Sequence, residues 1–169
     1  VAPKALYIIV SNPCDIMTYA FAKLSGLPES QILGSGTALD TARLRCRLSR
    51  HYGVSEKNIH AYVFGEHGDT SFVPWSRAFV AGATLDEFDK IAHEDQKDMP
   101  PLDKEEVLEY VHTSGSTVIA KKGATFYAVA VSVCRLCSLL LAASDTIVSV
   151  STMLHGEYGI EDVCLSTMA

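Results

Sequence analysis

The segment Lys4-Ala-Leu-Tyr-Ile-Ile-Val10 sets the first constraint on the fold. Its β-branched and aromatic residues favour extended backbone, and the Ser11-Asn12-Pro13 that follows is a turn signal. The apolar residues do not alternate with polar ones, which predicts a strand covered on both faces, as in a parallel sheet. No strand–helix unit precedes this strand to supply parallel neighbours. We therefore expect a fragment that consists of the last strand of a missing domain followed by a second domain.

Further helices and strands follow along the chain. We expect helices over Ile16–Leu24, Ala38–Tyr52, Leu85–Ala92, Asp103–Lys122 and Thr125–Ser144, with Asp15 and Asp103 as N-caps. We expect strands over Gln31–Leu33, Ile59–Phe64, Thr146–Met153 and Asp162–Ser166. The helix over Thr125–Ser144 is nearly all apolar, which predicts a central, buried position. The last strand stops close to Ala169, so we expect the second domain to be cut short at its C-terminal end.

Composition and charge exclude several classes of protein. The chain has 169 residues, of which 48% are hydrophobic and 20% charged, and this balance is typical of a globular domain. No apolar run reaches the ~18 residues of a membrane-spanning helix, so we expect no membrane partner. Lys plus Arg is 14 and Asp plus Glu is 20, giving a formal net charge of −6. Nucleic-acid binding favours the opposite balance, so we expect no nucleic-acid partner.

Five cysteines, an odd number without regular spacing, predict reduced thiols and a cytoplasmic location. Cys134-Arg-Leu-Cys137 is a CxxC pair, but no second pair completes the four ligands that structural zinc needs. We expect both thiols to pack in a core, and we expect no metal site.

The stretch Gly34-Ser-Gly36 follows a predicted strand and precedes a predicted helix, as in a dinucleotide-binding fingerprint. Leu39 occupies the place of the third glycine, and the acidic residue that should follow the next strand is missing. We therefore interpret this stretch as a tight turn and not as a cofactor loop.

The predicted helix over Ala38–Tyr52 carries four arginines. At about 100° per residue, Asp40 and Arg43 share one face, while Arg45 points about 200° away from Arg43. Composition alone favours a solvated face with Asp40 and Arg43 as an i,i+3 ion pair. The functional alternative is a carboxylate and a guanidinium that project together into a cleft.

His67 lies in Gly65-Glu-His-Gly-Asp69, at the end of a predicted strand. Flanking glycines allow a sharp turn that exposes a side chain, which suits an active-site loop. Histidine is the natural acid/base at neutral pH, and no nucleophile motif accompanies it. The alternative is an ordinary turn histidine.

Six segments together resemble the L-lactate/malate dehydrogenase superfamily, in the family's order and over nearly the whole chain. They are Val10-Ser-Asn-Pro-Cys-Asp15, Gly36-Thr-Ala-Leu-Asp-Thr-Ala-Arg-Leu-Arg45, Val63-Phe-Gly-Glu-His-Gly-Asp-Thr70, Val73-Pro-Trp-Ser76, Lys122-Gly-Ala-Thr-Phe-Tyr127 and Gly156-Glu-Tyr-Gly159. Glu66 resembles the lactate dehydrogenase branch, because malate dehydrogenases usually carry a second glycine there. The resemblance implies that residues 1–12 are the last strand of an absent dinucleotide-binding (Rossmann) domain. It also implies that residues 13–169 have the fold of the family's C-terminal domain, an α+β substrate domain of long helices on small, twisted, mostly antiparallel sheets.

The resemblance implies reversible NADH-dependent reduction of pyruvate to L-lactate. It thereby implies a role in glycolysis and in the fermentation of pyruvate to lactate. His67 would be the proton donor and acceptor, and Asp40 would hold its ring. Arg43 would clamp the substrate carboxylate bidentately, a geometry that lysine cannot copy.

The resemblance also implies roles in substrate, cofactor and effector binding for other residues. Asn12 would bind the substrate oxygen, Thr125 would line the substrate pocket, and Val10, Ser11 and Asn12 would lie near the NAD nicotinamide. It further implies a homotetramer. In bacterial members that fructose 1,6-bisphosphate activates, an arginine and a histidine at the positions of Arg45 and His60 bind the effector. A surface arginine and an exposed histidine are the alternative for that pair.

Two other functions remain open. One is malate or branched 2-hydroxy acid dehydrogenase activity in the same superfamily, and the other is a non-catalytic interaction or oligomerisation domain. These 169 residues lack the glycine-rich cofactor loop, its acidic ribose partner and the mobile loop whose arginine polarises the carbonyl. We therefore expect the chain alone neither to bind NAD measurably nor to turn over pyruvate.

Overall fold

The computed structural model describes residues 2–142 and 146–169, and the chain divides into two compact units. The first unit comprises Val1–Leu39, Phe64–Ser71 and Thr125–Ala169. The second comprises Asp40–Val63 and Phe72–Ala124. Long helices and small, mostly antiparallel sheets make up both, so the expected α+β class is confirmed.

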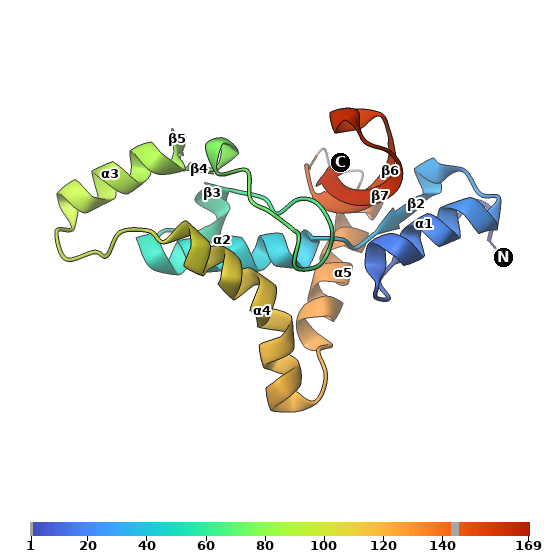
Figure 1. Cartoon of the computed structure of the whole chain (residues 1–169), viewed down its shortest axis with the longest axis horizontal. Coiled ribbons are helices and arrows are strands. Elements are labelled where there is room, and N and C mark those ends of the chain that lie inside the picture. Colours follow the sequence, from blue (N-terminus) through green and yellow to red (C-terminus); the bar gives the residue numbers. More distant parts are fainter. Residues whose placement is uncertain (1, 143–145) are drawn as a thin grey trace. The chain divides into compact units, whose positions relative to one another are not determined.

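The first unit is built on a four-stranded sheet in the order β1 (Tyr7–Ile9), β2 (Ile32–Gly34), β6 (Ser149–His155) and β7 (Glu161–Met168). Strands β2, β6 and β7 are labelled in Figure 1. β1 and β2 are parallel, whereas β6 runs antiparallel to both β2 and β7. Helix α1 (Cys14–Ser25) connects β1 to β2 and packs against β2, β6 and β7. One parallel neighbour of β1, strand β2, therefore follows it in the sequence.

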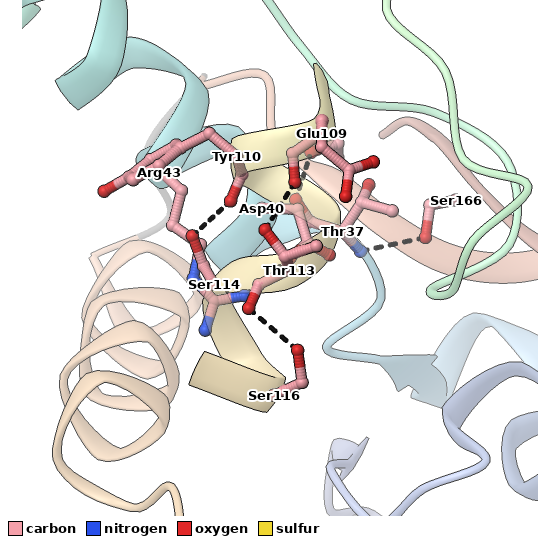
Figure 2. Close-up of polar contacts among 10 residues, drawn as sticks. Thr37, Asp40, Arg43, Glu109, Tyr110, Thr113, Ser114, Ser116 and Ser166 are labelled. Carbon is pink, nitrogen blue, oxygen red and sulfur yellow. Dashed lines mark hydrogen bonds and ion pairs between the residues drawn. The ribbon is translucent and has the colours of Figure 1, made fainter. Parts of the chain in front are cut away.

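The glycine stretch after β2 is a tight turn, as expected. Gly36 has a φ of +46°, and a β-carbon there would come within 2.7 Å of the Ser151 amide nitrogen. The next residue, Thr37, donates its N–H to the Ser166 hydroxyl at 3.0 Å (Figure 2). A residue with a side chain at position 36 would break this close approach of the turn to β6.

The start of α1 differs from the expectation. Its N-cap is Pro13, with no side-chain capping bond, and Asp15 lies inside the first turn. The Asp15 carboxylate is instead used by a distant backbone N–H, as described below. The predicted capping role of Asp15 is therefore wrong, because a long-range partner takes its oxygen.

The second unit has a hydrophobic core between its helices and a three-stranded antiparallel sheet. The helices are α2 (Ala38–Tyr52, in this unit from Asp40 onward), α3 (Leu85–Asp95) and α4 (Lys104–Lys122). The strands are β3 (Ile59–His60), β4 (Phe79–Val80) and β5 (Ala83–Thr84). The fully buried Leu44 and Leu48 lie one helical turn apart on α2 and pack with Val63 and Val80.

Strand β3 is shorter than the expected range Ile59–Phe64. The Val63 N–H donates to the Thr41 hydroxyl at 2.9 Å, and the Ala61 carbonyl accepts from Arg45 Nε at 3.0 Å. Side chains of α2 thus take backbone groups that a longer strand would use for pairing.

Helix α4 begins as predicted, because the Asp103 carboxylate accepts from the Glu105 and Glu106 N–H groups at 3.0 Å each. It ends at Gly123, whose φ is +80°. Several of its hydroxyls donate back to carbonyls of the preceding turn, including Thr113 to Glu109 at 2.7 Å (Figure 2).

The sequence predicts a central helix over Thr125–Ser144, of which residues 143 and 144 lie outside the described part of the chain. The observed helix is α5 (Tyr127–Leu141), and the prediction of a central position is wrong. Tyr127, Val131 and Leu141 are 71%, 70% and 88% exposed, and Leu136 is the buried residue of the helix. Cys134 is exposed and Cys137 half-buried, so the two thiols do not pack in a core. Apolar composition predicts burial, but it does not supply the packing partner. No helix among residues 2–142 and 146–169 has the length and apolarity to cross a membrane.

Candidate active site

His67 lies on a loop that the first unit holds at its root. Gly65 forms an antiparallel bridge with Ser166 of β7, in which each residue's N–H donates to the other's carbonyl at 2.9 Å. Gly65 has a φ of +91°, so the chain leaves the bridge through a turn that favours glycine. The bridge attaches the beginning of the loop to the sheet.

A second contact holds the loop at His67 itself. The His67 backbone N–H donates to Asp15 Oδ2 at 2.7 Å, and Asp15 is 8% exposed. Beyond His67, the Thr70 hydroxyl donates to Glu66 Oε2 at 2.5 Å, and the Gly68 N–H donates to the Glu66 carbonyl at 2.9 Å. The half-buried His67 is therefore carried by a defined turn, as an active-site histidine requires.

The buried carboxylate of Asp15 also affects a neighbouring thiol. Burial raises the pKa of Cys164 on β7 to about 11, and the negative charge of Asp15 adds to this rise. Cys164 is 1% exposed, so it packs as a small apolar residue and not as a reactive thiolate.

The second unit contains an ion pair between two predicted site residues. Arg43 Nη1 donates to Asp40 Oδ1 at 2.9 Å, across one turn of α2. Their side chains are only 16% and 8% exposed. The pair is thus largely shielded from water, which strengthens the charge interaction relative to a solvated helix face. The expectation of a solvated face is wrong, and the i,i+3 pairing is confirmed.

Arg45 on α2 and His60 on β3 belong to the same unit. Arg45 Nε donates to the carbonyl of Ala61, the residue after His60, and its guanidinium lies 4.6 Å from the Tyr62 ring centroid. His60 is exposed on β3. Arg45 points to a different set of residues from Arg43, as the helical spacing predicts.

Val10, Ser11 and Asn12 follow the carboxyl end of β1. Val10 is half-buried, and Ser11 and Asn12 are exposed. The peptide bond between Asn12 and Pro13 is cis. Thr125 is half-buried and lies two residues before α5. Among the described residues, no group of three or more His, Cys, Asp and Glu side chains is placed to hold a metal ion.

The structure therefore brings together Asp40 with Arg43, and His67 with Asp15. His67 belongs to the first unit and Asp40 to the second, so the pairing of the imidazole with the Asp40 carboxylate stays a prediction. Sequence reasoning missed Asp15 and Ser166 as supports of the loop. The Asn-Pro-Cys-Asp motif contains Asp15, but no local pattern indicates a contact 52 residues away.

Family models match both parts of the chain. The C-terminal domain of lactate/malate dehydrogenases, an α/β domain, matches residues 37–169, and the NAD-binding domain of the same family matches residues 1–34. The chain belongs to the lactate/malate dehydrogenase family. The second match covers β1, α1 and β2. The division of the chain after residue 12 stays a prediction.

Curated relatives of this chain carry the name L-lactate dehydrogenase. The one from Acetivibrio thermocellus is 42% identical over 161 residues, and the one from Treponema denticola is 45% identical over 163. These alignments cover 95% and 96% of this chain, but 50% and 51% of the relatives. The chain thus spans about half the length of the curated relatives it matches.

Two solved structures are similar over 97% of this chain. An L-lactate dehydrogenase from Clostridium thermocellum is 42% identical with a TM-score of 0.85, and 52% of it is covered. A lactate dehydrogenase from a deep-sea metagenome is 34% identical with a TM-score of 0.89, and 51% of it is covered. The expected fold of the family's C-terminal domain is confirmed.

Proposed function

We propose that the gene's full-length product is an NAD-dependent L-lactate dehydrogenase that reduces pyruvate reversibly to L-lactate. The observation that carries this proposal is the His67 loop, held by Ser166 at its root and by Asp15 at the histidine. The names of the curated relatives support lactate over other 2-hydroxy acids.

His67 supplies the proton in this proposal. Reduction of a 2-keto acid adds a hydride to the carbonyl carbon and a proton to the carbonyl oxygen. The imidazolium of His67 donates that proton, and the neutral imidazole accepts it in the reverse direction. A turn with a fixed backbone limits the positions that the ring reaches, which favours a defined transfer distance.

Asp40 and Arg43 divide two tasks between them. The Asp40 carboxylate orients the His67 ring and stabilises its charged form, while Arg43 binds the substrate carboxylate. The 2.9 Å contact between Asp40 and Arg43 supports this arrangement, because it fixes the guanidinium through one nitrogen, Nη1. Arginine has further N–H donors for a bidentate contact with a carboxylate.

The residues after β1 fit a nicotinamide site. Ser11 and Asn12 are exposed at the carboxyl end of a strand that pairs in parallel with β2, which is where α/β sheets bind ligands. NADH, when bound, supplies the hydride. Asn12 would hydrogen-bond the substrate oxygen, and Thr125 would line the pocket beside it.

A comparison of three substrates tests the proposed activity. We expect the full-length product to reduce pyruvate with a higher kcat/KM than oxaloacetate or 2-ketoisocaproate. A preference for oxaloacetate would identify a malate dehydrogenase, and a preference for 2-ketoisocaproate a branched 2-hydroxy acid dehydrogenase. The variant Arg43→Lys should raise the KM for each acid, because an ammonium lacks the planar fork that binds a carboxylate bidentately.

We further propose that Arg45 and His60 bind a phosphate of fructose 1,6-bisphosphate. The support is that Arg45 contacts the backbone directly after His60 and that His60 is exposed. Titrating fructose 1,6-bisphosphate into the full-length product should change its activity or its assembly, and Arg45→Gln should weaken this response. Unchanged activity and unchanged assembly in the wild type contradict the proposal.

The remaining expectations belong to the same proposal. They are a homotetramer, a cytoplasmic location, and a role in the fermentation of pyruvate at the end of glycolysis. Five cysteines with no disulfide among the described residues are compatible with a reducing compartment.

A further inference from the structure

We propose that Asp15 is a positioning residue that sets the place of the proton donor by holding the backbone of His67. This inference rests on the proposed dehydrogenase function, and it adds a residue that acts on the histidine from behind instead of through its ring. Asp15 and His67 belong to the same unit and are 52 residues apart in the sequence.

The contact itself is short and has a charged acceptor. The His67 N–H lies 2.7 Å from Asp15 Oδ2, within the range of charge-assisted hydrogen bonds. A bond to the backbone N–H constrains the residue to which the imidazole is attached, whatever the ring contacts. It therefore restricts the position of the ring in a way that a ring contact does not.

The acceptor sits on a rigid support. Asp15 is in the first turn of α1, which packs against β2, β6 and β7. The neighbouring Cys14 and Thr18 are each 1% exposed, and the Thr18 hydroxyl donates to the Cys14 carbonyl at 2.8 Å. Because β7 also holds Gly65 through Ser166, the His67 turn is attached at two points to one packed body.

The burial of Asp15 is difficult to explain by stability alone. Its residue is 8% exposed, and its Oδ1 has no hydrogen-bond partner among residues 2–142 and 146–169. A buried carboxylate with one oxygen unsatisfied is costly, and an apolar side chain of similar size would avoid that cost. The contact of its Oδ2 with the His67 N–H gives this buried carboxylate a role in holding the turn.

A second role for Asp15 is purely structural, and it makes a different prediction. A negative charge in the first turn of a helix interacts favourably with the helix dipole. That role needs the charge and not the bond, whereas positioning needs an acceptor at Oδ2 and not the charge. Asparagine keeps an oxygen acceptor of the same length and removes the charge, so it separates the two roles.

The test compares three variants of the full-length product: Asp15→Ala, Asp15→Asn and Asp162→Asn. Asp162 is the matched control, because its carboxylate also contacts α1, through Lys23 at 2.6 Å, but its side chain is 64% exposed near the beginning of β7. The φ of Asp162 is +57°, a left-handed backbone conformation that asparagine also adopts, so Asp162→Asn does not strain the backbone. The measurements are kcat and KM for pyruvate, the solvent deuterium isotope effect on kcat, and hydrogen exchange of the His67 amide.

Removal of the acceptor should act on the chemical step. We expect Asp15→Ala to lower kcat by about 10²-fold, as a displacement of about 1 Å does, with the pyruvate KM within about threefold of wild type. The solvent isotope effect should increase, because proton transfer becomes slower than the other steps. The His67 amide should exchange at least about tenfold faster. Asp15→Asn should stay within about fivefold of wild type in kcat, and Asp162→Asn should match wild type.

Several outcomes overturn the inference. An unchanged kcat in Asp15→Ala, in an enzyme whose wild type reduces pyruvate, shows that the contact does not position the proton donor. Equal losses in Asp15→Asn and Asp15→Ala show that the charge matters and not the acceptor. If Asp15→Ala does not fold, Asp15→Asn and the wild type still test the inference. Fast hydrogen exchange of the His67 amide in the wild type shows that its hydrogen bond to Asp15 is not formed. A wild type that does not reduce pyruvate counts against the proposed function, while the amide measurement still tests the contact.

Discussion

Gly34, at the end of β2, lies where three parts of the first unit meet. A β-carbon there would fall on the Thr18 hydroxyl and within 2.9 Å of the Ser151 β-carbon. Both neighbours are buried, so they have little room to move. Gly115, in the middle of α4, has no atom within 4 Å of the corresponding position. The two glycines therefore serve different purposes, although the sequence does not distinguish them.

Alanine at these two positions should have opposite effects on stability. Gly34→Ala should lower the free energy of unfolding by about 1–3 kcal/mol, because the added methyl overpacks a buried contact. Gly115→Ala should raise it by about 0.5–1 kcal/mol, since alanine is the better helix former. Urea titrations of both variants beside the wild type measure the difference. A stabilising Gly34→Ala would show that β2 and α1 are not packed as described.

At the scale of elements, local sequence patterns predict the features that depend on local contacts, such as the bounds of a helix and its N-cap. Helix α2 has the expected bounds, and Asp103 caps α4 as expected. The sequence predicts a capping role for Asp15, because nothing near it in the sequence shows that the His67 N–H uses its carboxylate. Strand β3 is short because Thr41 and Arg45 take backbone groups across the unit. Such long-range competition for hydrogen bonds leaves no periodic pattern to read.

The end of α2 and helix α3 share a half-buried cluster. The Tyr52 hydroxyl donates to Asp89 Oδ1 at 2.9 Å, and the His51 ring meets the Tyr52 ring edge-on at a centroid distance of 4.7 Å. Burial lowers the pKa of His51, and Asp89 partly opposes this shift. The fold therefore favours the neutral imidazole.

This cluster makes stability depend on pH in a defined direction. The unfolded chain binds a proton at His51 with a pKa of about 6.5, and the folded protein does so only at lower pH. The free energy of unfolding should therefore fall as the pH drops below about 6.5 and towards the folded pKa. His51→Phe, which cannot titrate at this position, should reduce this dependence. Denaturation midpoints measured across that pH range decide, and an identical slope in His51→Phe and wild type would be the contrary result.

At the scale of the whole molecule, six ordered motifs predicted the family, and the family models bear this out. The resemblance carried by these motifs implies three separate roles in one reaction for Asp40, Arg43 and His67. The pairing of Asp40 with Arg43 could be predicted from helical spacing alone, and it is present. The exposure of α5 could not, because burial depends on a packing partner as well as on composition.

Cofactor binding by the 169-residue chain gives a separate prediction. Its sequence contains no glycine-rich dinucleotide loop and no acidic ribose partner. We expect a calorimetric titration of the isolated chain with NADH to show no measurable heat of binding. Tight binding would mean that residues 1–34, which match the family's NAD-binding domain, hold the cofactor without that loop.

The proposed catalysis depends on His67 as the group that gives its proton to the substrate. The most direct test of this role is the steady-state rate of NADH-dependent pyruvate reduction by the full-length product and by its His67→Asn variant. The NADH affinity is measured on both proteins. We predict that kcat falls by about 10²–10⁴-fold while NADH binding is retained, because only the acid/base assistance is lost. An unchanged rate in the variant would contradict catalysis by this residue and would favour a non-catalytic interaction domain.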